Sequence, residues 1–180
     1  MSVNRFHANA KKRYVQAMEW LYIASIGTAA LAMLVMTFII PYGVFMRYVM
    51  NSPASWPEPA GVLLMVLFSF MGGAAAYRAA GHMAVTTVVR MLSEANQVRI
   101  FRMADIGMAV VAMFMIVWGI RLVKVVWYQS IAEFPDLSVG ITYMPIPVGG
   151  VVLLLFVIER IWCGEPPASS ITFRDQPQTE

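Results

Sequence analysis

The sequence predicts an all-α membrane protein of four transmembrane helices, with an interfacial amphipathic helix between the second and the third. The first reason is composition, because 59% of the 180 residues are hydrophobic, too large a share for a soluble domain to cover. The second is that four long stretches lack charged and histidine residues. Together with the residues that flank it, each stretch is about as long as a bilayer-spanning helix, which needs about 20 apolar residues. The stretches run from Glu19 to Arg47, from Glu58 to Arg78, from Asp105 to Arg121 and from Asp136 to Glu159.

The chain begins with a polar and basic segment, residues 1–18, and reaches its first span at about residues 20–46. Within the basic segment, Asn9 to Glu19 could form a short helix on the membrane surface. The first apolar run exceeds the roughly 7–15 residues of a secretory signal core, so we expect it to remain as a span. Pro41 lies in its last third and should kink it, because proline removes a backbone hydrogen bond.

The second span is predicted at about residues 58–77 and opens with Trp56-Pro57-Glu58. A proline and an acid suit the first turn of a helix, where N–H groups lack partners and the helix dipole is positive. Farther along, Gly72 and Gly73 begin a run of small residues. Small residues let membrane helices approach closely, so these two glycines are candidate helix-packing positions.

A longer polar connection, Arg78 to Arg102, leads to the third span. Residues 82–92 alternate apolar and polar groups, which indicates an interfacial amphipathic helix; an extension of the second span into water is the alternative. The third span covers about residues 103–125, and Gln129 to Met144 is predicted to be a polar loop.

The fourth span is predicted at about residues 145–162, and Gly149 and Gly150 near its start are further candidate helix-packing positions. Together the four spans make one membrane domain, residues 19–163. Residues 164–180 are rich in proline, serine and glutamine, a composition that predicts a disordered tail.

Positive charge is distributed unevenly between the two sides of this domain. Four spans put both termini on one side, which holds ten of the thirteen lysine and arginine residues. Since positive charge favours the cytoplasmic side, both termini are predicted to be cytoplasmic. The ten are Arg5, Lys11, Lys12, Arg13, Arg78, Arg90, Arg99, Arg102, Arg160 and Arg174, against Arg47, Arg121 and Lys124 on the other side.

The sequence offers little chemistry for catalysis or cofactor binding. Cys163 is the single cysteine, which excludes an internal disulfide and redox chemistry between paired cysteines. The two histidines, His7 and His82, lie at the ends of predicted segments, where they would not face each other across a haem. We find no nucleophile beside a base, no metal-ligand cluster and no phosphate-binding glycine loop. We therefore expect no enzyme activity, no cofactor or metal, and no nucleic-acid partner.

The ionisable residues that flank the spans allow more than one interpretation. Arg47 and Glu58 flank one turn and could pair or be solvated separately, because exposed pairs contribute only about 0–1 kcal/mol. Asp105 could bind a coupling ion, but a local salt bridge to Arg102 on the same helix face is favoured. Arg121 is expected to snorkel to the opposite interface.

No ionisable residue is expected inside the bundle, whereas proteins that move ions through their own helices usually keep one there. We therefore expect this chain to work through a partner. His82, which follows Gly81, could sense pH, although anchoring a turn or contacting a partner is the commoner role.

Several short motifs, through their order and spacing, carry a resemblance to a known family. They are Arg47-Tyr48, Ser52-Pro53, Trp56-Pro57-Glu58, Phe70-Met71-Gly72-Gly73-Ala74 with Arg78, Gly81-His82-Met83-Ala84-Val85, and Pro145-Ile146-Pro147-Val148-Gly149. Over about residues 15–162 the chain resembles the small membrane subunit of tripartite ATP-independent periplasmic (TRAP) transporters, the DctQ type. Pro59 departs from the family, which often has a second acid after Glu58, and this weighs against a mechanism that needs paired carboxylates there.

The resemblance implies a subunit of an ion-driven secondary transporter in the inner membrane of bacteria or archaea. Its partners would be a large membrane subunit of about twelve spans, which carries substrate and coupling ions, and a periplasmic binding protein for an organic acid, such as a carboxylate or sialic acid. The small subunit would act as a scaffold for the large one. The candidate partner contacts are Arg47, Trp56 and Glu58 on the outer side and Arg78 and His82 on the cytoplasmic side.

Two other classes of function compete with this interpretation. A stand-alone four-helix transporter, such as a small multidrug exchanger, needs an acid within the membrane. A membrane enzyme or electron carrier needs paired histidines, paired cysteines or a cluster of acids. Neighbouring genes for a large membrane protein and a secreted binding protein would favour the transporter subunit.

Overall fold

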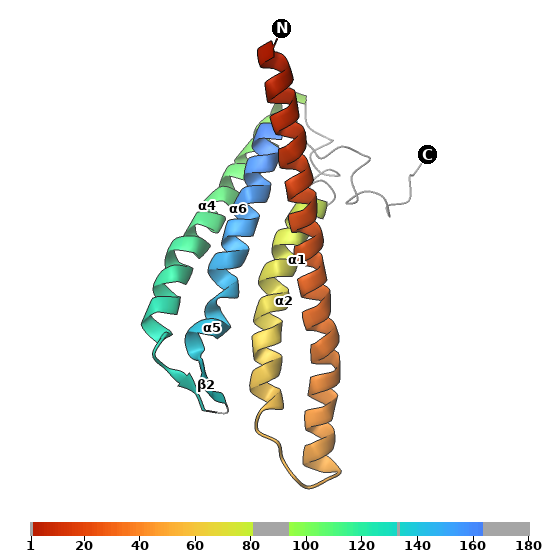
Figure 1. Cartoon of the computed structure of the whole chain (residues 1–180), viewed down its shortest axis with the longest axis vertical. Helices are drawn as coiled ribbons and strands as arrows, with labels where there is room; N and C mark the ends of the chain where they lie inside the picture. The colour runs from red at the N-terminus through yellow and green to blue at the C-terminus, as the bar shows by residue number, and fades with distance from the viewer. Residues whose placement is uncertain (1, 81–93, 133, 164–180) are drawn as a thin grey trace, which may run out of the picture.

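A computed structural model describes the backbone of residues 2–80, 94–132 and 134–163. Figure 1 shows the start of α1 and the end of α6 at one end of the molecule, which we call the terminal end. The opposite end, called the hairpin end, contains residues 49–56, 127–132 and 134–144. The elements are α1 (Ser2–Tyr48), α2 (Pro57–Ala80), α4 (Glu94–Val126), β1 (Ser130–Ile131), β2 (Phe134–Ser138), α5 (Val139–Tyr143) and α6 (Pro145–Cys163).

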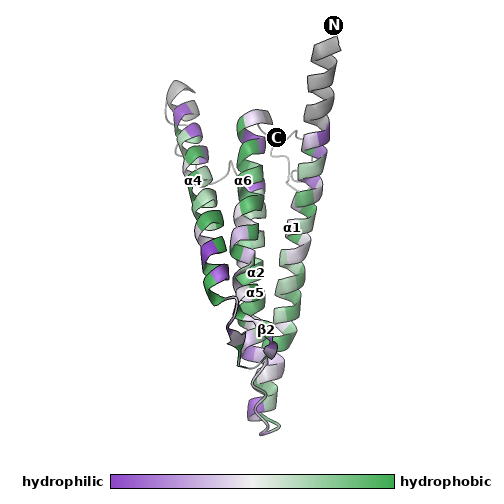
Figure 2. Ribbon diagram, turned by 60° about the vertical axis from the view of Figure 1, so that its left-hand side comes forward, coloured by the Kyte–Doolittle hydropathy of each residue, from purple (hydrophilic) through white to green (hydrophobic). Residues whose placement is uncertain are grey.

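The predicted four-span helical fold is confirmed. Among the described residues, helices long and apolar enough to cross a membrane cover Arg13–Tyr48, Pro57–Ala79, Arg99–Val126 and Val139–Trp162. Figure 2 shows apolar residues along these helices, with the most hydrophilic ones mainly toward the helix ends. The amphipathic helix predicted at 82–92 and the disordered tail predicted at 164–180 lie outside the described residues.

α1 is a single helix that contains both the basic N-terminal segment and the first span. The separate surface helix expected from Asn9 to Glu19 is therefore wrong: this stretch is part of α1, because it contains no glycine or proline to end a helix. Pro41 lies inside the same helix, which continues to Tyr48. At about 1.5 Å per residue, the 47 residues of α1 extend well beyond a hydrocarbon core of about 30 Å.

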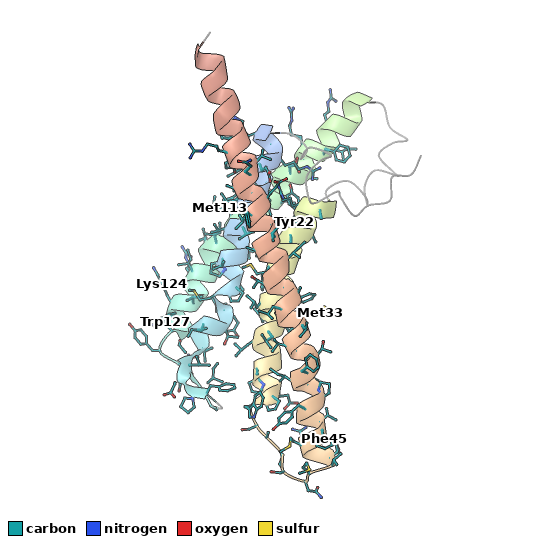
Figure 3. All side chains as sticks on the ribbon, turned by 45° about the vertical axis from the view of Figure 1, so that its right-hand side comes forward. Tyr22, Met33, Phe45, Met113, Lys124 and Trp127 are labelled. Atoms are coloured by element: carbon teal, nitrogen blue, oxygen red, sulfur yellow. The ribbon has the colours of Figure 1, made fainter. Side chains whose placement is uncertain are left out.

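The four long helices pack as two pairs, α1 with α2 and α4 with α6, and the pairs meet mainly through α2 and α6. Figures 1 and 3 show the pairs close together toward the terminal end and separated at the hairpin end, where α1 and α2 reach farther than α4 and α6. The two pairs are therefore joined over only part of their length. The buried core consists of Met18, Tyr22, Ala74, Ala75, Ala112, Val152, Leu153 and Phe156.

The backbone of α6 comes closest to its neighbours at Gly149 and Gly150, two of the candidate helix-packing positions. A β-carbon on Gly149 would lie 2.9 Å from the β-carbon of Phe70 on α2. One on Gly150 would lie 3.0 Å from the β-carbon of Met115 on α4. Neither contact leaves room for a side chain, so these glycines let α6 sit between α2 and α4.

The two candidate packing glycines of α2 differ from each other. A β-carbon on Gly72 would meet the side chain of Ala29 at 3.6 Å, an ordinary contact between α2 and α1. A β-carbon on Gly73 would meet no other described residue within 4 Å. Only Gly72 of these two therefore packs against another helix within the described part of the chain.

The stretch predicted as a polar loop, Gln129 to Met144, is partly ordered into β1, β2 and α5. β1 and β2 pair antiparallel. Ser138 then caps α5, because its hydroxyl accepts a hydrogen bond from the Gly140 N–H at 3.0 Å. The fourth apolar segment therefore begins at Val139 rather than at Pro145. A serine directly before an apolar run was the local signal for this start.

Candidate functional site

Polar contacts between helices gather at the two ends of α2. At the hairpin end, Arg47 Nη2 lies 3.7 Å from Glu58 Oε2, and the two side chains are 53% and 82% exposed. This long, exposed pair is worth only about 0–1 kcal/mol. Beside it, the ring centre of Trp56 lies 5.7 Å from that of Tyr42. The structure thus pairs two of the three outer residues that the sequence singled out, and it places the third, Trp56, against Tyr42 at the same end.

Arg47 and Glu58 border a cavity of about 110 Å³ between the facing ends of α1 and α2. The two helices approach closely here, since a β-carbon on Gly43 would lie 2.9 Å from the β-carbon of Pro57. The proline in the first turn of α2 thus positions Glu58 opposite Arg47. The cavity is lined by Ile40, Gly43, Val44, Arg47, Tyr48, Ala54, Pro57 and Glu58.

At the terminal end, Arg78 of α2 and Glu159 of α6 form a buried ion pair. Arg78 Nε donates to Glu159 Oε2 at 2.8 Å, and Arg78 Nη2 donates to Oε1 at 2.9 Å. The two side chains are only 2% and 3% exposed. The guanidinium carbon lies 5.2 Å from the ring centre of Tyr22 and 5.5 Å from that of Phe156. A planar guanidinium suits this place, because it forms two parallel hydrogen bonds and stacks on aromatic faces.

A second polar cluster adjoins this pair and centres on Asp105 of α4. The hydroxyl of Tyr77 donates to Asp105 Oδ1 at 2.8 Å, and Arg160 Nε lies 3.4 Å from the same oxygen. The predicted pairing of Asp105 with Arg102 is wrong, because Asp105 is buried in the bundle and Arg102 is exposed. Residues three apart on a helix point about 60° apart, which is enough to separate an inward from an outward position.

The expectation that no ionisable residue lies inside the bundle is also wrong at this end. Arg78, Asp105 and Glu159 are all buried, although each limits an apolar stretch of the sequence. Hydropathy places such residues near an interface, but it does not tell whether they face water or a neighbouring helix. The available signal was the opposite charge of residues that end different spans on one side of the membrane.

The five candidate partner contacts therefore have different surroundings. At the hairpin end, Arg47 and Glu58 border one cavity, and Trp56 contacts Tyr42. Arg78 lies in the interior, where its contacts are within this chain, so it offers almost no surface to another protein. His82 lies outside the described residues.

One further cation–aromatic contact lies on α4. Near the hairpin end of α4, the Arg121 guanidinium lies 5.0 Å from the ring centre of Trp118, and both residues are exposed. A cation over an aromatic face is typical of side chains at headgroup depth. Among the described residues, no three His, Cys, Asp or Glu side chains gather as metal ligands would. What this part of the chain offers is paired charge and apolar surface.

The sequence also matches a known family. Residues 33–165 match tripartite ATP-independent periplasmic transporters, DctQ component. The match includes α2, α4 and α6 in full, and both Arg–Glu pairs lie within it. No curated protein matches the chain at a significant level. The chain belongs to the DctQ component family of tripartite ATP-independent periplasmic transporters.

Proposed function

We propose that this chain is the small inner-membrane subunit of a TRAP importer and a scaffold for the large transport subunit. The importer takes up an organic acid, either a carboxylate or a sialic-acid-like compound, which a periplasmic binding protein captures. An ion gradient drives uptake, and both termini of this chain face the cytoplasm. Membership of the DctQ family supports the assignment to a tripartite system.

The observation that carries the scaffold role is that the buried carboxylates already have partners within the chain. Glu159 accepts two hydrogen bonds from Arg78, and Asp105 is held by Tyr77 and Arg160. A carboxylate that binds and releases a coupling ion must exchange such partners during each cycle. Fixed pairs at these positions therefore favour a subunit that supports transport in another chain over one that transports alone.

The outward faces of the spans support the same role. Large apolar side chains are more than 40% exposed on each of the four long helices, for example Phe38, Val62, Phe114 and Val151. In a membrane such surfaces contact lipid or another membrane protein. A scaffold subunit needs apolar contact area of this kind.

Reconstitution tests this proposal. The binding protein, the large subunit and this chain are placed in liposomes together and in each two-part combination, with a sodium gradient imposed. We expect organic-acid uptake only from the complete set. Uptake by this chain alone would favour the stand-alone transporter, and full-rate uptake without it would overturn the scaffold role.

The orientation has a separate test. Reporter fusions are made after Ser170 and within Asp136–Gly140. The charge bias predicts that these two positions lie on opposite sides of the membrane. We expect periplasmic phosphatase activity only from the fusion within 136–140. An active phosphatase fused after Ser170 would place the termini on the periplasmic side.

A further inference from the structure

We propose that the buried polar residues at the terminal end are a register lock between the two helix pairs. Arg78–Glu159 and Tyr77–Asp105–Arg160 fix how far the α1–α2 pair is shifted and rotated relative to the α4–α6 pair. Their role is to select one arrangement, and the adjoining apolar packing holds the pairs together. This inference concerns the chain alone and stands apart from the proposed function.

The contact surface between the two helix pairs is short, and most side chains in it are small or aliphatic. It extends from the Gly149–Phe70 contact to the Arg78–Glu159 pair, and toward the hairpin end the helix pairs separate (Figure 1). Most of the buried residues between these points are small or aliphatic, such as Ala74, Ala75 and Val152, and the buried ring of Phe156 lies at the terminal end beside Arg78. Such residues pack almost equally well after a small shift, because lipid provides no hydrophobic penalty against sliding. Between the close contact at Gly149 and the polar residues of the terminal end, apolar contact alone therefore specifies the register weakly.

The polar contacts specify it strongly because they use consecutive residues. Tyr77 reaches Asp105 on α4, whereas the next residue, Arg78, reaches Glu159 on α6. Consecutive residues point about 100° apart around a helix, so only one rotation of α2 satisfies both contacts. A shift by one residue would break both.

α6 repeats the same arrangement with opposite charges. Glu159 pairs with Arg78 on α2, whereas the next residue, Arg160, pairs with Asp105 on α4. The rotation of α6 is thus fixed between two helices in the same way as that of α2.

The first helix joins the lock through an aromatic contact. Arg78 lies between the rings of Tyr22 on α1 and Phe156 on α6. Figure 3 places Tyr22 on α1 in the region where the two helix pairs lie close together. Residues of all four long helices therefore take part.

Buried ion pairs often add little net stability relative to well-packed apolar residues, although removal of one partner is costly. A single charge inside an apolar interface is known to select register and orientation in helical assemblies. If Arg78–Glu159 acts in this way, replacing both residues by leucine should keep the fold and lose the single arrangement.

The test uses spin labels in the full chain, in lipid nanodiscs, with Cys163 changed to serine. Labels at Val62 on α2 and Val151 on α6 report the distance between the helix pairs, and both positions are exposed. The variants are Arg78→Leu, Glu159→Leu and the double Arg78→Leu/Glu159→Leu, and the double variant also carries Tyr77→Phe so that the second polar contact between the helix pairs is removed. The control is the exposed pair, changed as Arg47→Leu/Glu58→Leu.

We expect a single narrow distance distribution in the parent and in the control. The double leucine variant should stay folded but give a broadened distribution or one displaced by about 5.4 Å, one helical turn. Each single variant should reduce the yield of folded chain at least tenfold. A folded double variant with the parent's narrow distribution would overturn the proposal, and so would a double variant that unfolds, because the pair would then hold the fold together.

Discussion

The two ends of α2 carry the same pair of residue types in opposite environments. At the hairpin end, Arg47 and Glu58 are exposed and lie 3.7 Å apart. At the terminal end, Arg78 and Glu159 are buried and share two hydrogen bonds, the shorter of 2.8 Å. The loss of one partner should therefore be nearly neutral at the hairpin end, where water screens the remaining charge, and costly at the terminal end, where the remaining charge has no water.

The largest expected difference between the two ends comes from removing one carboxylate charge. Glu159→Gln leaves the buried Arg78 guanidinium facing a neutral amide, which should reduce stability by about 3–5 kcal/mol. Glu58→Gln, the matched change at the hairpin end, should cost at most about 1 kcal/mol. Unfolding in mixed micelles, followed by tryptophan fluorescence, measures both. Equal losses would show that burial does not distinguish the two pairs.

The next effect concerns the close approach that brings α6 to α2. Gly149→Val would put a side chain where a β-carbon already lies 2.9 Å from Phe70, and should cost about 1–3 kcal/mol through overpacking. Gly73→Val is the control, because a β-carbon there meets no other described residue within 4 Å. Thermal aggregation of the two variants gives the comparison. A smaller loss for Gly149→Val than for the control would contradict this packing.

An effect of similar size is expected from one hydroxyl group. Tyr77→Phe removes the hydrogen bond to the Asp105 carboxylate and should cost about 1.5–3 kcal/mol, the usual range for hydrogen bonds to charged groups. Tyr42→Phe at the hairpin end is the control. The Tyr42 hydroxyl makes no side-chain hydrogen bond within the described part of the chain, and its loss should stay within about 0.5 kcal/mol. The same unfolding assay checks both, and similar losses would argue against a role for the Tyr77 hydroxyl.

The smallest effect on stability is expected at the exposed pair, which makes it a place to look for a role in partner contact. Glu58→Arg should change stability by less than about 1 kcal/mol, yet impair uptake by the complete transporter without altering substrate affinity of the binding protein. Adding Arg47→Glu should restore part of the uptake if the two residues act as a pair. A double variant no better than Glu58→Arg would exclude pairing as the reason.

The spans could be predicted from the sequence because bilayer thickness sets their length and lipid demands apolar side chains. The predicted bounds 58–77 compare with Pro57–Ala80, and 145–162 compare with Pro145–Cys163 of α6, although the fourth apolar segment already begins with α5 at Val139. Where helices continue beyond the apolar run, hydropathy gives no end signal, so α4 begins at Glu94 rather than near residue 103. For the same reason, hydropathy did not show that α1 extends toward the N-terminus beyond its apolar run.

The two Arg–Glu pairs also differ in whether the sequence could predict them. Arg47 and Glu58 flank one short turn, so sequence proximity was enough to suggest their contact. Arg78 and Glu159 are 81 residues apart, and their contact depends on which helices are neighbours and how each is rotated. No local pattern encodes that information. Proximity in sequence therefore identified the weak pair and missed the strong one.

The long separation between Arg78 and Glu159 has a consequence for biosynthesis. A ribosome adds about 5–20 residues per second, so the 81 residues that separate the two side chains take roughly 4–16 s to make. During that interval α1 and α2 are complete, while the carboxylate that Arg78 contacts does not yet exist. The two helix pairs therefore cannot dock through Arg78 and Glu159 until translation has passed Glu159, so this contact forms late in folding.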